Sequence, residues 1–365
     1  MTTSKLLAAR AGVAERAVGS RHLRRVWGVP GTALGAVNWP VDLAARTHVR
    51  FNYWWQAHLL DCALDAHLRA PTKGREALVR KLVRGIRVRN VLGWTNRYYD
   101  DVAWLGLALQ RAARQGVAKP RALDVIAAHL RAGWTDHAGG GIWWRTNDDF
   151  KNVPANGPAA IFLARRAEVT GDRADLGRAE STVDWIEANL LDGDTGLLFD
   201  GLHVHPDGRV REVERTLFTY CQGVVLGACV EIARVEEDPV WSDRAARIVD
   251  AVDKHLATDG VLRGHGGGDG GLFGGILARY LAQAALHLPG DASALAADLV
   301  FRSAEALWTN RSIVVSGPLF GPEWTDPAQR PTRASAERDL SVQLGGWMLL
   351  EAAALLERND FTPPR

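Results

Sequence analysis

Two adjacent carboxylates, Asp100 and Asp101, are the residues of this chain whose type and spacing best suit acid–base chemistry. They stand in RYYDDVAWLGLAL, residues 97–109, between two tyrosines and an apolar run. The apolar residues from Trp104 to Leu109 recur at three- and four-residue steps, which predicts a helix that buries one face. The pair therefore falls on the first turn of this helix, where two neighbouring side chains can both reach forward from the helix end.

Two carboxylates that flank one bond form the arrangement that hydrolyses a glycosidic bond. One attacks the anomeric carbon or activates water, and the other donates a proton to the leaving oxygen. Retaining enzymes hold the two groups about 5 to 5.5 Å apart and inverting ones about 6.5 to 9.5 Å, so sequence neighbours favour retention. The alternative is a helix cap, because Asp is favoured there. The aromatic residues Tyr98, Tyr99 and Trp104 favour the sugar site, since a cap needs no flat aromatic faces.

The position at a helix start constrains the acid. A helix N-terminus favours negative charge and lowers the pKa of both carboxyls, whereas one of them must hold a proton. Repulsion between Asp100 and Asp101, together with burial by the aromatic residues, would raise one pKa again.

Composition indicates an ordinary globular protein. The chain has 365 residues, 47% hydrophobic and 24% charged, with a formal charge of +2. This balance argues against nucleic acid as a partner, and the densest basic cluster, residues 80–89, is typical of a solvated helix face. The cysteines Cys62, Cys221 and Cys229 lack the CxxC spacing of a metal site, and their odd number favours a reducing compartment. The fourteen tryptophans, several of them in expected loops, favour a carbohydrate groove.

The N-terminal segment is basic and nearly free of acids. Arg24 and Arg25 precede a mild apolar run, which faintly resembles a twin-arginine export signal, but Pro30 and the late position weaken that interpretation. We expect a cytoplasmic protein, with residues 1–40 as a helical extension packed on one catalytic domain, residues 41–365. No apolar stretch approaches the roughly 18 residues of a membrane span.

The rest of the chain reads as a succession of helices. With a first helix at 5–18, the periodicity predicts twelve, the others at 42–69, 75–88, 97–115, 120–131, 154–170, 174–190, 216–235, 240–256, 271–288, 292–309 and 338–357. Only the short segments 141–145 and 197–199 alternate like strands. Every second helix opens with polar and aromatic residues and continues with small apolar ones. We therefore predict an all-α (α/α)6 barrel, with the long connections around its mouth.

Five ordered blocks resemble glycoside hydrolase family 76, the alpha-1,6-mannanases. RYYDDVAWLGLAL is similar to the Asp-Asp signature of this family. The other blocks are YWWQAHLLDCALDA at 53–66, GGIWWRTNDDFKNVPANGPAAIFLARR at 140–166, TYCQGVVLGACVEI at 219–232 and LFGGILARYLAQ at 272–283. The resemblance implies a retaining enzyme, similar to the endo-alpha-1,6-mannanases and without metal or other cofactor, and it leaves endo against exo cleavage open. Asp100 would be the nucleophile, Asp101 the acid/base, and an alpha-mannan oligosaccharide or mannosylated glycan the substrate.

The sequence departs from this family in two positions and at its N-terminus. Cys221 stands where the family usually has Asn, and Leu105 where a second Trp is common, so the accepted glycan could differ. The first residues of the chain do not resemble the usual secretion signal, so we expect an intracellular enzyme. An intracellular enzyme would meet imported oligosaccharides or a mannosylated glycolipid headgroup.

Further polar and aromatic residues at the expected helix openings are candidate substrate contacts. A histidine in an inner helix is as often a core group, and a loop tryptophan is equally often an anchor. The candidates are Gln56, His58, Tyr99, Trp104, Lys151, Asn152, Asn156, Asp200, Tyr220, Gln222 and Trp324.

Two alternative functions remain open. A non-catalytic mannan- or oligosaccharide-binding protein would use the same aromatic collar without cleaving a bond. A sugar epimerase on the same toroid would depend on histidines at the inner helix openings, of which His58 is the one example. A terpene cyclase is disfavoured, because Trp104 occupies the place of the further acid that its metal motif needs.

Overall fold

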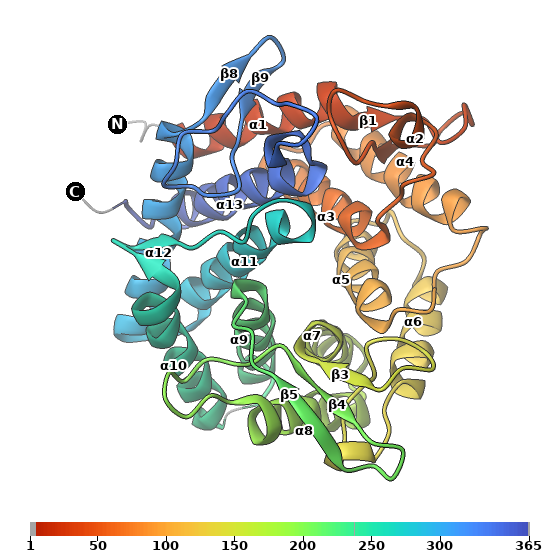
Figure 1. Ribbon diagram of the computed structural model, residues 1–365, viewed down its shortest axis with the longest axis vertical. Coiled ribbons are helices and arrows are strands. Elements are labelled where there is room, and N and C mark those ends of the chain that lie inside the picture. The colour runs from red at the N-terminus through yellow and green to blue at the C-terminus, as the bar shows by residue number, and fades with distance from the viewer. Residues whose placement is uncertain (1–4, 237, 364–365) are drawn as a thin grey trace.

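A computed structural model describes residues 5–236 and 238–363 of the chain. Six inner helices surround the centre of a ring, and six others lie outside them (Figure 1). The inner helices are α3 (Tyr53–Arg69), α5 (Tyr99–Arg114), α7 (Val153–Thr170), α9 (Thr219–Ala233), α11 (Phe273–His287) and α13 (Leu340–Arg358). The outer helices are α1 (Leu6–His22), α4 (Lys73–Arg89), α6 (Pro120–Ala132), α8 (Arg173–Leu190), α10 (Pro239–Leu256) and α12 (Gly290–Thr309). The predicted (α/α)6 barrel is confirmed.

The N-terminal helix α1 packs against α13 and takes an outer position in the ring. Its buried Arg21 donates from Nη2 to the carbonyl of Pro318, at 2.8 Å, and to Gln343 of α13, at 3.1 Å. The first helix therefore joins the ends of the chain. The predicted domain boundary at residue 40 stays a prediction.

The predicted helix at 42–69 is wrong in its first third. It divides into the short α2 (Leu43–Arg46) and α3, because His48 and Asn52 adopt left-handed backbone conformations, with φ of 54° and 43°. An α-helix requires negative φ throughout, so the chain must leave the helix between these residues. Short 3-10 turns, η2 (Gly268–Leu272) and η3 (Ala336–Arg338), likewise precede α11 and α13.

The strands do not form at the two segments predicted to alternate, but elsewhere in the chain. Residues 141–145 and 197–199 form isolated bridges only. A three-stranded antiparallel sheet instead joins β3 (Phe150–Asn152), β4 (Gly201–Val204) and β5 (Val210–Glu214). Hairpins of two strands complete the set: β1 (Leu23–Arg24) with β2 (Leu34–Gly35), β6 (Ala257–Thr258) with β7 (Val261–Leu262), and β8 (Ser312–Val314) with β9 (Gly317–Leu319).

Small residues let the inner helices approach closely, as their sequence indicated. A Cβ atom added at Gly157 of α7 would lie 2.3 Å from a methyl group of Val224 on α9. One added at Gly227 would lie 2.3 Å from the ring of Tyr280 on α11. Because closely packed interiors leave no room for even one methyl group, these glycines set the distance between neighbouring helices.

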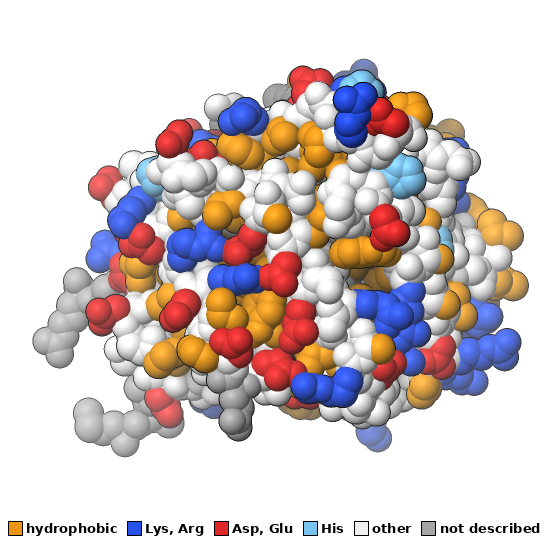
Figure 2. All heavy atoms as spheres, turned by 90° about the horizontal axis from the view of Figure 1, so that it is seen from below, with side chains coloured by type: hydrophobic (Ala, Val, Ile, Leu, Met, Phe, Trp, Pro, Cys, Tyr) orange, Lys and Arg blue, Asp and Glu red, His pale blue; other side chains and the backbone are white. Residues whose placement is uncertain are grey.

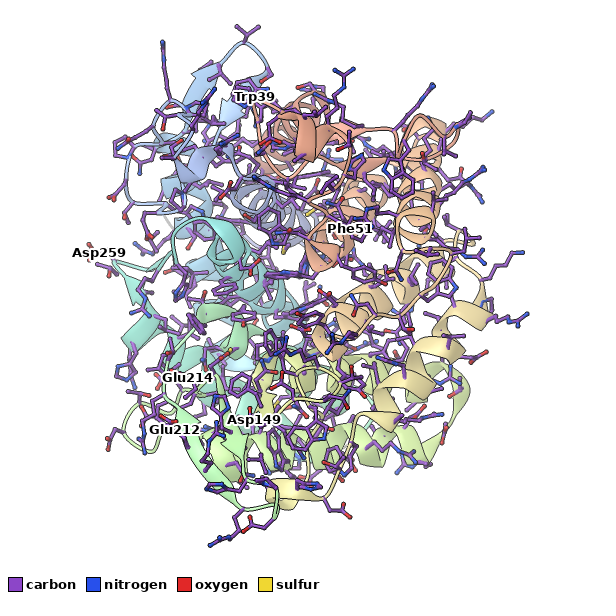
Figure 3. The ribbon with its side chains drawn as sticks, turned by 45° about the vertical axis from the view of Figure 1, so that its right-hand side comes forward. Trp39, Phe51, Asp149, Glu212, Glu214 and Asp259 are labelled. Carbon is purple, nitrogen blue, oxygen red and sulfur yellow. The ribbon has the colours of Figure 1, made fainter. Side chains whose placement is uncertain are left out.

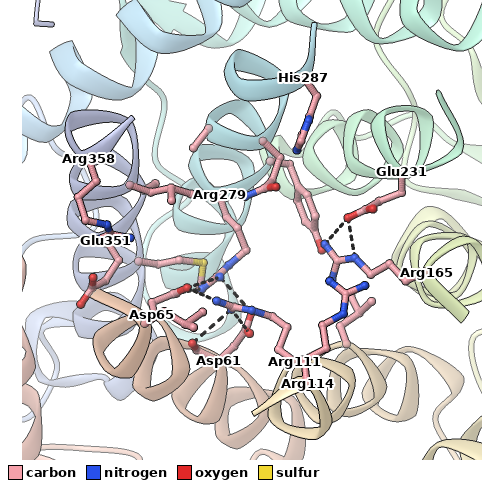
Figure 4. A pocket seen from close by; sticks show the side chains of 18 of the residues that line it. Asp61, Asp65, Arg111, Arg114, Arg165, Glu231, Arg279, His287, Glu351 and Arg358 are labelled. Atoms are coloured by element: carbon pink, nitrogen blue, oxygen red, sulfur yellow. Dashed lines mark hydrogen bonds and ion pairs between the residues drawn. The ribbon is translucent and has the colours of Figure 1, made fainter. Parts of the chain in front are cut away.

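Buried ion pairs lock the inner helices at the end where they terminate (Figure 4). Arg279 of α11 bonds Asp65 of α3, with Nη2 and Oδ2 2.6 Å apart, and Arg111 of α5 bonds both Asp61 and Asp65. These side chains line a cavity of about 340 Å³. The network joins α3, α5 and α11. It resists a shift of one helix against another, because such a shift would leave a buried charge without its partner.

All six inner helices begin at the end of the barrel opposite to these ion pairs.

Within the described residues, none of the helices combines the length and the apolar character needed to cross a bilayer.

Candidate active site

A cavity of about 550 Å³ opens where the inner helices begin. Its walls come from the starts of α3, α5, α7, α9 and α11, from the β3–β4 region and from η2. The lining residues are Asn52, Tyr53, Trp54, Tyr98, Asp100, Asp101, Trp104, Trp144, Phe150, Asn152, Pro154, Asp200, Tyr220, Asp269 and Phe273. The predicted Asp pair therefore lies in a cavity built mainly from aromatic and acidic side chains.

Asp100 is held by two N–H donors. The indole Nε1 of Trp144 donates to Oδ2 at 3.0 Å, and the backbone N–H of Asp101 donates to Oδ1 at 2.8 Å. The Trp144 backbone is fixed in turn, because its carbonyl accepts from the N–H of Tyr99 at the start of α5. Both carboxyl oxygens of Asp100 thus have a defined direction.

Asp101 has a different anchor. The side-chain amide of Asn96 donates to its Oδ2 at 2.6 Å, and the Asn96 oxygen accepts from the backbone N–H of Tyr98. Asn96 lies in the loop before α5, so the same turn that starts the helix also orients the second carboxyl. The carboxyls of these two consecutive residues are therefore held by different hydrogen-bond donors.

The two carboxyls are harder to ionise than ordinary ones. Burial, and then the charge of Asp101, raise the pKa of Asp100 well above its usual value, against the donors described above. Burial raises the pKa of Asp101 to about 6, the hydrogen bond from Asn96 opposes this, and the charge of Asp269 adds to it. The charge of one carboxyl disfavours the charge of the other, so burial and repulsion both favour a protonated member of the pair.

Aromatic side chains form the walls beside the pair. The rings of Trp54 and Trp104 are stacked with centroids 6.4 Å apart, and Phe273 lies 6.4 Å from Trp54. Tyr220 stacks on Phe273 at 3.8 Å, with an interplanar angle of 11°. Flat apolar faces with a polar rim are suited to the C–H-bearing faces of a sugar ring.

A third acid, Asp200, faces the cavity from the segment before β4. Burial raises its pKa to about 6, and the thiol of Cys221 donates to its Oδ1 at 3.5 Å. The backbone carbonyl of Asp200 accepts from Val153, which ties it to the start of α7. The departure at Cys221 thus replaces an amide donor by a weaker thiol donor to an acid that lines the cavity. Leu105, the second departure, is fully buried.

Six of the predicted site residues meet in this cavity, namely Asp100, Asp101, Trp104, Asn152, Asp200 and Tyr220. Asn152 also caps α7, because its Oδ1 accepts from the N–H of Ala155.

Three predicted contacts, Gln56, Asn156 and Gln222, do not line the cavity. Each is the fourth residue of its inner helix, is fully buried, and bonds both the N–H and the carbonyl of one residue in a connecting segment, at distances between 2.7 and 3.0 Å. These partners are Gly35 of β2 and the loop residues Ile142 and Leu198. The prediction that these three residues contact substrate is therefore wrong. Their side-chain amides bind backbone groups and hold the connecting segments on the helices.

Four further residues that were predicted to contact substrate lie outside the cavity. His58 lies behind Trp104 with ring centroids 4.6 Å apart, and burial lowers its pKa to about 3, so it is neutral. Tyr99 faces His129 of α6 instead of the mouth. Lys151 donates to the carbonyls of Thr135, His137 and Gly140 and so fixes the loop before β3. Trp324 is buried against the start of α11. Burial and backbone bonding account for these side chains.

Other functional positions had weaker signals in the sequence. Tyr98, Trp54 and Trp144 stand in the sequence blocks that resemble the family, and all three line the cavity. Nothing in the local sequence marks Asn96 or Asp269. Asp269 lies in a glycine-rich loop and accepts from the indole of Trp55 at 2.8 Å. Its nearness to Asp101 depends on the closure of the ring through α13, which brings η2, just before α11, to the start of α3.

Comparisons with known proteins agree with this geometry. The sequence model of Glycosyl hydrolase family 76 matches residues 16–355. The solved GH76A alpha-1,6-mannanase from Salegentibacter sp. HEL1_6 is 33% identical, with 96% of this chain and 99% of that chain covered, at a TM-score of 0.84. An inactive variant of that mannanase, with asparagines in place of two consecutive aspartates, has been solved with alpha-1,6-mannotriose.

Two further relatives share the fold or part of the sequence. The Lin0763 protein from Listeria innocua is 27% identical, with 98% of this chain and 99% of that chain covered, at a TM-score of 0.85. The mannan endo-1,6-alpha-mannosidase DCW1 from Candida glabrata is 27% identical over 168 residues, which are 42% of this chain and 37% of that protein. The chain thus matches little more than a third of this curated relative. The family match covers nearly all of the chain, which therefore belongs to glycosyl hydrolase family 76.

Proposed function

We propose that the protein hydrolyses alpha-1,6-mannosidic bonds with retention of configuration, with Asp100 as nucleophile and Asp101 as acid/base. The observation that carries this proposal is the pair of consecutive, separately anchored carboxyls in an aromatic-walled cavity. The alpha-1,6-mannanase among the similar structures supports the substrate class. The order of the two roles follows the resemblance of RYYDDVAW to the family signature.

In the first step, an oxygen of Asp100 attacks C1 of a mannosyl unit while the bond from C1 to the leaving oxygen breaks. Asp101 transfers its proton to that oxygen. The donors on Asp100, from Trp144 and the Asp101 backbone, keep its carboxylate directed during the attack. The charge of Asp269 helps Asp101 to hold its proton until then, because a nearby negative charge disfavours a second one.

In the second step, water attacks C1 of the mannosyl–Asp100 ester. Asp101, now an anion, takes a proton from this water, and Asp100 leaves as carboxylate. Two inversions at C1 give a product of the original configuration. Trp54, Trp104 and Phe273 exclude other water from the reacting carbon, as the walls of the cavity on which the ring would stack.

The roles can be separated with an aryl mannoside whose leaving group needs no protonation. We expect Asp101→Ala to release the phenol from this substrate in a burst and then to stall at the ester. Azide should restore turnover and yield a mannosyl azide with the substrate's anomeric configuration, because it needs no general base. Asp100→Ala should form no ester. A burst from Asp100→Ala, or none from Asp101→Ala, would overturn the assignment.

A further inference from the structure

One side of the barrel mouth is strongly basic. We define the arginine-rich face as residues 23–51 and 80–98, which comprise β1, β2, α2, the second half of α4 and the loop to α5. Ten basic residues and a single acid, Asp42, occur in these two segments, although the whole chain has 44 basic and 42 acidic residues. The face seen in Figure 2, on another side of the molecule, has both signs interspersed.

Exposed apolar side chains project from the same face. Five large apolar residues are between 57% and 88% exposed, namely Trp27, Leu43, Val49, Val91 and Leu92. Trp27, Val91 and Leu92 also have positive φ, of 48°, 51° and 63°. Bulky residues rarely adopt this backbone conformation. All three residues lie in turns, and their side chains are exposed to solvent. Single exposed apolar residues need no explanation, but five of them among arginines on one face do.

Arginine side chains and backbone contacts fix these loops. The indole of Trp27 donates to the carbonyl of Thr47 at 2.8 Å. Arg89 donates from Nε to the carbonyl of His48 at 2.8 Å and lies over the rings of Trp27 and Phe51, at 5.6 and 5.0 Å. The loops that carry the apolar tips are therefore preorganised, although the tips themselves face solvent.

The arginine-rich face borders the catalytic cavity. Arg50 lines a second cavity, of about 570 Å³, which shares Asn52 and Asp269 with the catalytic one. In Figure 3, Phe51 lies on this side of the mouth, and Glu212 and Glu214 of β5 lie on the other side. A surface that bound the arginine-rich face would therefore meet one rim of the mouth.

We propose that the arginine-rich face docks on an anionic lipid bilayer. Arginines attract the negative surface of such a bilayer, and exposed Trp, Leu and Val side chains can enter the boundary between headgroups and acyl chains. A nucleic acid would match the arginines, but it offers nothing to the exposed Leu43, Val91 and Leu92. This docking is independent of the proposed hydrolysis, and it would bring the mouth to glycans displayed on a membrane.

Sedimentation of the full chain with vesicles tests the docking without turnover. We expect binding to phosphatidylcholine vesicles that contain about one third phosphatidylglycerol, and at least about tenfold weaker binding to phosphatidylcholine alone. Binding should weaken as salt rises from about 0.1 to 0.5 M, because salt screens exposed charges. Equal binding to both vesicle types, or to neither, would overturn the proposal.

Matched variants separate the apolar from the charged contribution. L43S/V91S/L92S should weaken vesicle binding about tenfold or more, and R46Q/R84Q by a similar factor. The controls are I313S/V315S, on the equally exposed tip of the β8–β9 hairpin, and R121Q/R330Q, two exposed arginines elsewhere. All four variants change exposed side chains, so folding should be kept, as circular dichroism can check. Losses in the controls as large as in the test variants would contradict docking through this face. So would tight binding to duplex DNA that L43S/V91S/L92S retains, with no vesicle binding.

Discussion

The indole of Trp144 donates a hydrogen bond to Oδ2 of Asp100, across a distance of 3.0 Å. The two residues are 44 positions apart and belong to different inner-helix openings. A side chain from the neighbouring loop therefore positions Asp100, the proposed nucleophile, at the mouth of the barrel. The donor is charge-assisted whenever Asp100 is an anion, so it should matter most before the attack on C1.

Trp144→Phe should lower kcat/KM for an alpha-1,6-mannoside by about 10- to 100-fold, because it removes one hydrogen bond to a charged group. Trp143→Phe is the matched control, since Trp143 is the adjacent tryptophan and does not line the cavity. Steady-state kinetics at constant pH measures both. Equal losses in the two variants would show that the loop, and not the indole donor, is responsible.

Asn96 and Asp269 should move the basic limb of the pH–rate profile in opposite directions. Asn96→Ala removes a donor that favours the Asp101 anion, so the pKa of Asp101 and the basic limb should rise. Asp269→Asn removes a negative charge that raises this pKa, so the limb should fall. Shifts of about half a unit to one unit are expected. Shifts of the same sign would be incompatible with Asp101 as the acid.

Asp200→Asn should stabilise the protein in a pH-dependent way. The pKa of Asp200 is raised to about 6 in the folded protein. The stability that its protonation contributes is complete below about pH 4, where the unfolded chain is protonated too, and is lost as the pH rises through 6. Asn cannot ionise, so the variant should exceed the native protein by about 2 kcal/mol at pH 8 and by little at pH 4. Urea unfolding at both pH values measures the difference.

The ion pairs at the far end of the barrel should contribute to stability and not to chemistry. Asp65→Ala leaves Arg111 and Arg279 short of a partner, and should lower the free energy of unfolding by about 3 to 5 kcal/mol. Asp298→Ala, which breaks an exposed pair with Arg302 on α12, should change it by about 0.5 kcal/mol or less. A kcat for Asp65→Ala far below the native value, in folded protein, would contradict this division.

The sequence was most informative where several signals coincided. Periodicity predicted the inner helices, and the Asp pair with its aromatic neighbours indicated the cavity that we propose as the active site. It misled at polar residues of helix openings. Gln56, Asn156 and Gln222 look like ligand contacts, but each clamps a loop by a paired backbone bond, and Gln343 of α13 does the same to Phe320. Local sequence cannot distinguish these uses, because a buried amide partner comes from a distant segment.

Asn96 and Asp269 could not be predicted for a related reason. Each acts on Asp101, but Asp269 is separated from it by 168 positions and reaches the same cavity only when the ring closes through α13, which packs against both α11 and α3. The exposed tips of the arginine-rich face likewise depend on left-handed conformations at Trp27, Val91 and Leu92, which their residue types do not favour.

The anomeric form of the first product tests the central claim most directly. The purified protein and its Asp100→Asn variant would be incubated with alpha-1,6-linked mannotetraose and followed by proton NMR. We expect alpha-anomeric product to appear first with the native protein and no cleavage with the variant. Initial beta-anomeric product, or cleavage by Asp100→Asn at the native rate, would contradict a retaining mechanism with Asp100 as nucleophile.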